Sequence, residues 1–182
     1  MEASCWSCYT PLDVRSEEGV EFLCAAREGR VDDVLRLLRS NATLVGARDA
    51  SAQTALHLAC IAGQVDVCDA LLEHDCDRNA RDDRGNAPLH CAALSGHLHC
   101  VQALLNPGTN QVADLHALNQ ACRSSFANAC WRGHSAIAKF MHECGARINE
   151  CDENGHTPAA LARAWNHAEL ADWCDSLGDN MK

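Results

Sequence analysis

The stretch TALHLACIAG at residues 54–63 is followed by a second copy, APLHCAALSG, at residues 87–96. Looser copies end at Gly29 and Gly133, so that successive glycines stand 34, 33 and 37 residues apart. A period of roughly 20–50 residues is the sequence signature of a repeat protein. The chain therefore divides into a flexible leader at 1–15 and one repeat domain at 16–182, with repeats at 16–48, 49–81, 82–118, 119–151 and a shortened 152–182.

The third repeat shows how one unit is built. A turn at 82–86 precedes Pro88, which starts a helix that we expect to end at Gly96, because glycine readily adopts the left-handed conformation. A second helix follows, with one buried face at Cys100, Val101, Leu104 and Leu105. Helices this short are unstable alone, so the pairs must stack into one elongated core. The sequence predicts an all-α solenoid.

The position after each second helix carries residue types that tolerate a positive φ angle. These residues are Asn41, Asp75, Gly108 and Gly145. The pattern predicts that the second helices end in the same way as the first.

Composition excludes several classes of protein. The 182 residues are 47% hydrophobic and 22% charged, which is typical of a chain that forms a folded core. A formal charge of -10 leaves no basic surface for DNA or RNA. No apolar stretch approaches the ~20 residues that a membrane helix needs, and no signal peptide is recognised. We expect a cytoplasmic protein, with the nucleus as the alternative, that binds neither nucleic acid nor membrane.

The repeats resemble those of the ankyrin-repeat family. Its T-P-L-H-x-A-A-x-x-G core is seen at 54–63, at 87–96 and in part at 157–162, and its G-A-D-x-N-A ending at 75–80 and 145–149. The resemblance implies a solenoid of helix-turn-helix units with β-turn or hairpin tips. It also implies a non-catalytic module that acts as an adaptor, scaffold or inhibitor by binding another protein.

Several residues match the family's structural positions. The resemblance implies that the imidazoles of His57 and His90 bond to the backbone of adjoining turns, and that Gly63, Gly96 and Gly133 end first helices. No serine, cysteine or histidine lies in a catalytic or phosphate-binding motif. We therefore expect neither an enzyme nor a cofactor.

In this family, partners are usually bound by the turn tips and by the exposed ends of the first helices. The fourth repeat is irregular and carries a net positive charge, whereas the other repeats are negative. Tryptophan and arginine are also common interface anchors. The sequence predicts a monomer that binds an acidic and apolar protein segment through Arg84, Asn86, Leu94, Arg123, Trp131, Arg132, His156 and Trp165.

Thirteen cysteines leave one alternative open. Most occupy small apolar positions of the repeats, where a free cysteine packs as a hydrophobic residue, while Cys144 and Cys151 lie nearer repeat boundaries. The Cys5/Cys8 pair lacks the further ligands of a zinc site, so no metal is predicted. A redox- or metal-responsive protein using this pair, or a substrate-recruiting subunit of an enzyme complex, remains an alternative function.

Overall fold

The computed structural model describes residues 17–106 and 112–179. The predicted leader, including Cys5 and Cys8, lies outside the described residues, and so does Gly108. In the part that is described, the chain forms helices and turns, and no helix is long and apolar enough to cross a membrane.

Each repeat contributes two antiparallel helices, and every pair is separated by a longer turn from the next. The pairs are α1 (Glu17–Glu28) with α2 (Val31–Ser40), α3 (Ala55–Ala62) with α4 (Val65–Glu73), α5 (Pro88–Ser95) with α6 (Leu98–Leu104), α7 (Ser125–Arg132) with α8 (Ser135–Glu143), and α9 (Pro158–Ala164) with α10 (Ala168–Asp179). A 3₁₀ helix, η2 (Ala42–Gly46), follows the first pair.

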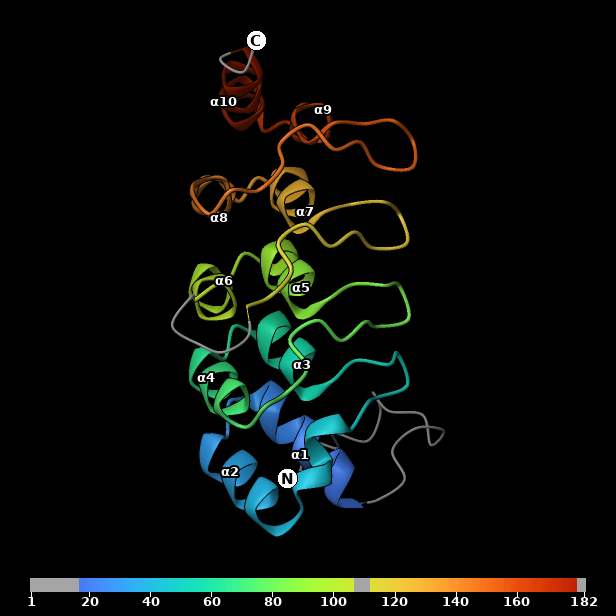
Figure 1. Ribbon diagram of the computed structural model, residues 1–182, viewed down its shortest axis with the longest axis vertical. Coiled ribbons are helices and arrows are strands. Elements are labelled where there is room, and N and C mark those ends of the chain that lie inside the picture. Colours follow the sequence, from blue (N-terminus) through green and yellow to red (C-terminus); the bar gives the residue numbers. More distant parts are fainter. Residues whose placement is uncertain (1–16, 107–111, 180–182) are drawn as a thin grey trace, which may run out of the picture.

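The helices form two rows, as Figure 1 shows. The first helices of the repeats stack on one another from α1 to α9, and the second helices stack beside them from α2 to α10. The turns between repeats project from the side of the first row. The predicted all-α solenoid of stacked helix pairs is confirmed. Isolated β-bridges at Arg48↔Thr54 and Leu118↔Ser124 close two of the tips.

One continuous apolar core runs between the two rows. The first row supplies fully buried Phe22, Leu56 and Phe126, and the second row supplies Leu104 and Met141. The predicted buried face of the third repeat is confirmed, since Cys100, Val101, Leu104 and Leu105 are all buried. Fully burying one such large side chain stabilises the fold by about 1.5–3 kcal/mol, so neighbouring repeats hold each other in place.

The helix ends follow the sequence with one exception. Gly96 ends α5 at φ 88°, while Asp75 and Gly145, after α4 and α8, have φ of 53° and 92°. The prediction for Asn41 is wrong, because its φ is -150° and its backbone is extended. Its side-chain oxygen instead accepts a hydrogen bond from the Thr43 N–H, which starts η2. Asparagine at this position caps the next helix rather than closing the last one.

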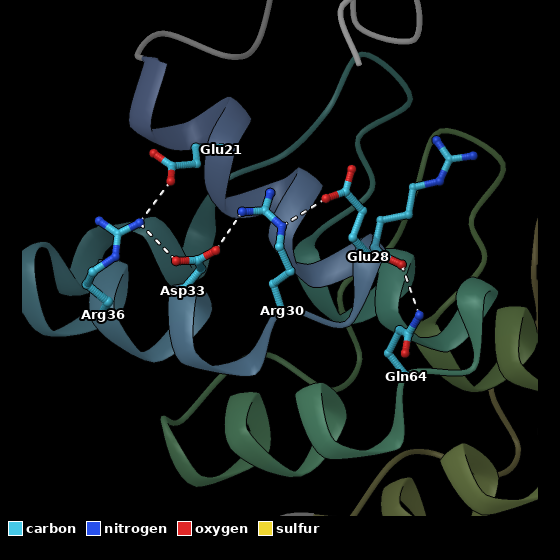
Figure 2. A network of polar contacts seen from close by, with 7 residues as sticks. Glu21, Glu28, Arg30, Asp33, Arg36 and Gln64 are labelled. Carbon is cyan, nitrogen blue, oxygen red and sulfur yellow. Dashed lines mark hydrogen bonds and ion pairs between the residues drawn. The ribbon is translucent and has the colours of Figure 1, made fainter. Parts of the chain in front are cut away.

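Exposed ion pairs cover the outside of the first repeat. Figure 2 shows Asp33 between Arg30 and Arg36, with nitrogen–oxygen distances of 2.6 and 3.2 Å. Such surface pairs contribute little to stability. A link to the second repeat comes from the Gln64 side chain, whose Nε2 donates to the carbonyl oxygen of Arg27 at 3.3 Å.

Candidate functional site

The turn tips share one arrangement that sequence reasoning missed. A carboxylate or amide oxygen accepts hydrogen bonds from the backbone N–H groups two and four residues later, as Asp82 Oδ1 does from Arg84 at 3.0 Å and Asn86 at 2.7 Å. The same bonds form at Asp49, Asn119 and Asp152. A side chain that bonds its own turn fixes the backbone there. The recurrence of Asp or Asn at the repeat period was the available signal.

His57 and His90 each join the first helix of their own repeat to the turn tip of the next repeat. Nδ1 of His57 accepts a hydrogen bond from the Thr54 N–H at 3.2 Å, and Nε2 lies 3.0 Å from the carbonyl oxygen of Asn86. His90 bridges Ala87 N–H and the Arg123 carbonyl oxygen in the same way. Because an N–H only donates and a carbonyl only accepts, the neutral ring with its proton on Nε2 satisfies both partners.

Burial also keeps these rings neutral. It lowers the pKa of His57, and it lowers the pKa of His90 to about 4. Charging an imidazole away from water is unfavourable, so the neutral form is favoured at physiological pH. The rings therefore hold the tips in position and are not poised for proton transfer at neutral pH.

The three predicted glycines have positive φ angles of 75° at Gly63, 88° at Gly96 and 76° at Gly133. Each lies directly under a histidine ring of the following repeat. At Gly96, an added Cβ atom would stand 2.6 Å from Cε1 of His134, whose Nε2 lies 3.3 Å from the carbonyl oxygen of Leu94. A side chain at these positions would push neighbouring repeats apart.

A hollow of about 540 Å³, which we call the Trp131 hollow, lies between the turn tips and the first helices of the third to fifth repeats. Its lining residues are Arg84, Asn86, Leu94, Asn119, Gln120, Ala121, Arg123, Asn128, Trp131 and Glu153. Five of the eight residues predicted to bind a partner are among them. Its volume falls within the range of about 300–1,000 Å³ that is typical of ligand pockets.

The other three predicted residues lie beside this hollow. Trp165 meets Trp131 edge to face, with ring centroids 5.7 Å apart, and the guanidinium of Arg132 lies 5.7 Å from the centroid of Trp131. His156 Nδ1 is 3.3 Å from Asp152 Oδ1. The structure therefore brings all eight predicted residues to one place, although binding itself stays a prediction.

Arg123 has a second role within the fold. Its Nη2 lies 3.0 Å from Asp152 Oδ2, and its guanidinium lies 4.7 Å from the centroid of the Trp131 ring. Burial raises the pKa of Asp152, but hydrogen bonds from the His156 backbone and the Arg123 side chain outweigh it, so the pKa is lowered. Arg123 is thus partly neutralised and holds Trp131 in place through a cation–π contact.

Two cations around the hollow remain available. Among the residues that the structure describes, the exposed guanidinium groups of Arg84 and Arg132 form no ion pair. Glu153 contributes a negative charge to the lining. The nearby indole of Trp165 is 56% exposed, which is unusual for so large an apolar side chain. The site therefore combines free positive charge with an exposed aromatic surface.

Asn128 is a site residue that sequence reasoning missed. It is only 3% exposed, yet it lines the hollow, and its side-chain amide makes no hydrogen bond to the residues that the structure describes. Its amide is not among the fully buried, unpaired side-chain groups of the described residues, so it keeps surface open to the hollow. The equivalent residues of other repeats are Leu58, Cys91 and Leu161, so a polar residue at this repeat position was the available signal.

The cysteines show no binding cluster in the described part of the chain. Cysteines at the small apolar positions of the repeats are buried as predicted, and Cys144 and Cys151 are exposed, as is Cys122. Within residues 17–106 and 112–179, no group of three or more His, Cys, Asp or Glu side chains could hold a metal ion. The alternative that uses Cys5 and Cys8 concerns residues outside this part.

The stacked pairs, the bonded tips and the glycine–histidine contacts define a helical repeat protein. The family model described as "Ankyrin repeats (3 copies)" matches residues 22–114. The chain belongs to the ankyrin-repeat family, whose members are typically non-catalytic interaction modules.

Curated relatives agree with this assignment. The chain is 33% identical over 140 residues to NF-kappa-B inhibitor alpha of Sus scrofa, covering 74% of this chain and 45% of that protein. It is 31% identical over 119 residues to NF-kappa-B inhibitor alpha of Gallus gallus, covering 64% and 37%. It is 30% identical over 131 residues to the E3 ubiquitin-protein ligase KEG of Arabidopsis thaliana, covering 71% and 8%. The chain thus spans less than half the length of these relatives. Together they support a protein-interaction module.

Proposed function

We propose that this protein is a non-catalytic adaptor, scaffold or inhibitor that binds a partner protein at the Trp131 hollow. The observation that carries the proposal is the meeting of all eight predicted binding residues around one hollow of about 540 Å³. Two relatives are inhibitors by name, which supports a role in binding another protein. The module would act as a monomer in the cytoplasm or the nucleus.

The chemistry of the hollow favours a segment with acidic and apolar side chains. Arg84 and Arg132 supply positive charge that no described residue pairs, and Trp165 supplies exposed aromatic surface. Arginine and tryptophan residues of this kind contribute disproportionately to protein interfaces. Opposite charge on the partner also speeds association and sets its orientation.

The test compares partner capture by two variants. Affinity purification from the native cell, followed by mass spectrometry, would use wild-type protein and the double variant Trp131→Ala/Arg132→Glu. A matched control is Lys139→Glu, which reverses an exposed charge of the same repeat on α8, in the second row.

We expect the double variant to lose most of the captured partner and Lys139→Glu to retain it, with both variants folded by circular dichroism. Equal capture by the wild type and the double variant would contradict a binding site at Trp131. Light scattering of the purified protein checks the monomer, and a mass that grows with concentration would count against it.

A further inference from the structure

Asn128 differs from the residues at the same position in the other repeats of this chain, and packing does not explain the difference. The same helix position holds Leu58, Cys91 and Leu161 in other repeats, and all of these are apolar. Asn128 is just as buried, at 3% exposure, but the structure gives its amide no hydrogen-bond partner among the described residues. Asn128 is not among the described residues with a fully buried, unpaired side-chain atom, so its amide keeps surface open to the hollow and is available to a partner from outside.

The amide faces the Trp131 hollow and presents two kinds of group there. A primary amide offers N–H donors and a carbonyl acceptor next to each other. A carboxylate or a phosphate only accepts hydrogen bonds and would leave the carbonyl of Asn128 unpaired. A peptide bond offers one N–H and one C=O, and it satisfies both sides of the amide. The chemistry of Asn128 thus matches a polypeptide backbone better than an anionic group alone.

The backbone that binds must also have its own groups free. In a helix or in the interior of a sheet, the N–H and C=O groups are already bonded within the partner. An extended segment leaves them available, and extended peptides are commonly held by such main-chain hydrogen bonds. The occupant is therefore an unpaired, extended stretch of chain and not the surface of a folded helix.

The charges around the hollow select which extended segment binds. Arg84 lines it, and Arg132 lies beside the Trp131 ring, and neither forms an ion pair with a described residue. The Trp165 ring is 56% exposed and stands next to Trp131. Acidic side chains would approach the two arginines, while an apolar side chain would cover Trp165.

We propose that the Trp131 hollow binds an extended peptide segment by pairing the side-chain amide of Asn128 with one peptide group of the backbone. This inference rests on the proposed function and deepens it, because it names the form in which the partner is recognised. Acidic residues flanking an apolar residue give the segment its specificity.

The test selects peptides from a display library of linear peptides on the full-length wild-type protein. Selected peptides are then measured against Asn128→Leu, which installs the residue that the second and fifth repeats carry at this position. The matched control is Gln102→Leu, the same kind of change at an exposed site on α6 in the second row. Each selected peptide is also made with single N-methyl groups along its backbone, which remove one N–H at a time.

We expect selected peptides to be enriched in acidic and apolar residues. Asn128→Leu should weaken them by about tenfold or more, a loss typical of a missing pair of hydrogen bonds, while Gln102→Leu leaves binding unchanged. N-methylation at one position should weaken binding to the wild type, and the same peptide should bind Asn128→Leu no worse than its unmethylated form. The part of the N-methyl series that is measured on the wild-type protein does not depend on how a variant folds.

Three results would overturn the inference: no peptide selected by the wild type, equal affinity of Asn128→Leu and the wild type, or no position sensitive to N-methylation. Failure of the inference alone is recognisable, because Trp131→Ala/Arg132→Glu would still lose the native partner while Asn128→Leu retains it. If the double variant also keeps the partner, the proposed function itself fails.

Discussion

Arg123 and Asp152 form an ion pair between the tips of the fourth and fifth repeats, with Arg123 Nη2 at 3.0 Å from Asp152 Oδ2. The carboxylate side chain of Asp152 is fully buried and also accepts hydrogen bonds from the backbone N–H groups of Asn154 and His156. One carboxylate therefore shapes its own turn and fixes the arginine that lies over Trp131. The pair therefore links the fourth and fifth tips and holds Arg123 against the Trp131 ring.

Removing the Asp152 carboxylate should destabilise the protein. We expect Asp152→Ala to lower the free energy of unfolding by about 1–3 kcal/mol, because the N–H groups of Asn154 and His156 and the Arg123 guanidinium lose their acceptor. Asp152→Asn should cost less, since Asn119 supports the equivalent turn of the fourth repeat. Urea unfolding measures both variants. If Asp152→Asn costs as much as Asp152→Ala, the charge is more important than the turn.

The same carboxylate gives a pH signature. Its pKa is lowered in the folded protein, so its contribution is fully present above the unfolded value of about 3.9 and is lost as the pH falls through the folded value. The stability difference between the wild type and Asp152→Asn should therefore shrink in strong acid. Urea unfolding across acidic pH checks this, and a difference that stays constant would contradict it.

The buried histidines should make the protein less stable in mild acid. Burial lowers the pKa of His90 to about 4, so the folded protein resists a proton that the unfolded chain accepts. Stability is unaffected by this group above the unfolded pKa of about 6.5 and is lost as the pH falls from there toward the folded value, by roughly 2 kcal/mol at about pH 5. Denaturant unfolding along a pH series measures the slope, and NMR titration of the His90 ring measures its pKa. A ring that titrates near the unfolded value would contradict this prediction.

Three glycine-to-alanine changes separate backbone strain from contact between repeats. Gly96 has a φ of 88°, and a Cβ there would stand 2.6 Å from His134; Gly145 has a φ of 92° with nothing within 4 Å; Gly46 has neither constraint. We expect Gly145→Ala to cost about 1–2 kcal/mol, the strain of a left-handed residue. Gly96→Ala should cost more, and Gly46→Ala should cost nothing or stabilise slightly. Thermal unfolding ranks the three. Equal losses at Gly96 and Gly145 would argue against the His134 contact.

The fourth tip holds a cysteine where two other tips hold glycine. Cys122 has a φ of 54°, and the equivalent Gly85 and Gly155 have 73° and 79°. Cys122→Gly should raise the free energy of unfolding by about 0.5 kcal/mol, because relief of left-handed strain exceeds the entropy that glycine adds to the unfolded chain. Gly155→Ala should lower the free energy of unfolding, because alanine is strained in the left-handed conformation. Its Cβ would meet nothing within 4 Å, so no steric contact adds to this strain. Urea unfolding of both variants checks the signs, and a loss of stability in Cys122→Gly would contradict the strain.

Thiol labelling should divide the described cysteines into two classes. Cys122, Cys144 and Cys151 are exposed and should react with a thiol reagent in the folded protein. The other described cysteines are buried, and burial raises the pKa of Cys91 to about 12, so that its thiolate is scarce. Mass spectrometry of peptides after brief alkylation identifies the modified sites. Rapid labelling of Cys91 without denaturant would show that the third repeat opens.

Periodicity alone predicted most of the fold. The glycine spacing indicated a solenoid of stacked helical repeats, and the buried face of α6 followed from its i, i+1, i+4, i+5 spacing. Asn41 was predicted wrongly because its residue type suits both a positive φ and a helix N-cap, and only the following η2 decides between the two. Local sequence rules name what a residue tolerates, and the neighbouring structure determines which option is used.

The candidate site was predicted in outline but not in its chemistry. Position within the repeat placed Arg123 and Trp131 on one surface, since equivalent residues of a solenoid line up. It could not show that Arg123 is already paired with Asp152, because these residues are far apart in sequence and meet only when the tips stack. Asn128 was missed because the absence of a hydrogen-bond partner for its amide is known only once its surroundings are known.

The sequence by itself determined the helix pairs, their number and their order, because these depend on turn residues and apolar spacing within each repeat. Only the tertiary structure decided which polar groups form ion pairs or hydrogen bonds within the protein and which stay unpaired. Asp152 neutralises Arg123, whereas Arg84, Arg132 and the amide of Asn128 remain unpaired among the described residues. Hydrogen bonds and ion pairs act over a few ångströms, so the stacking of neighbouring repeats determines which polar groups of the candidate site stay unpaired.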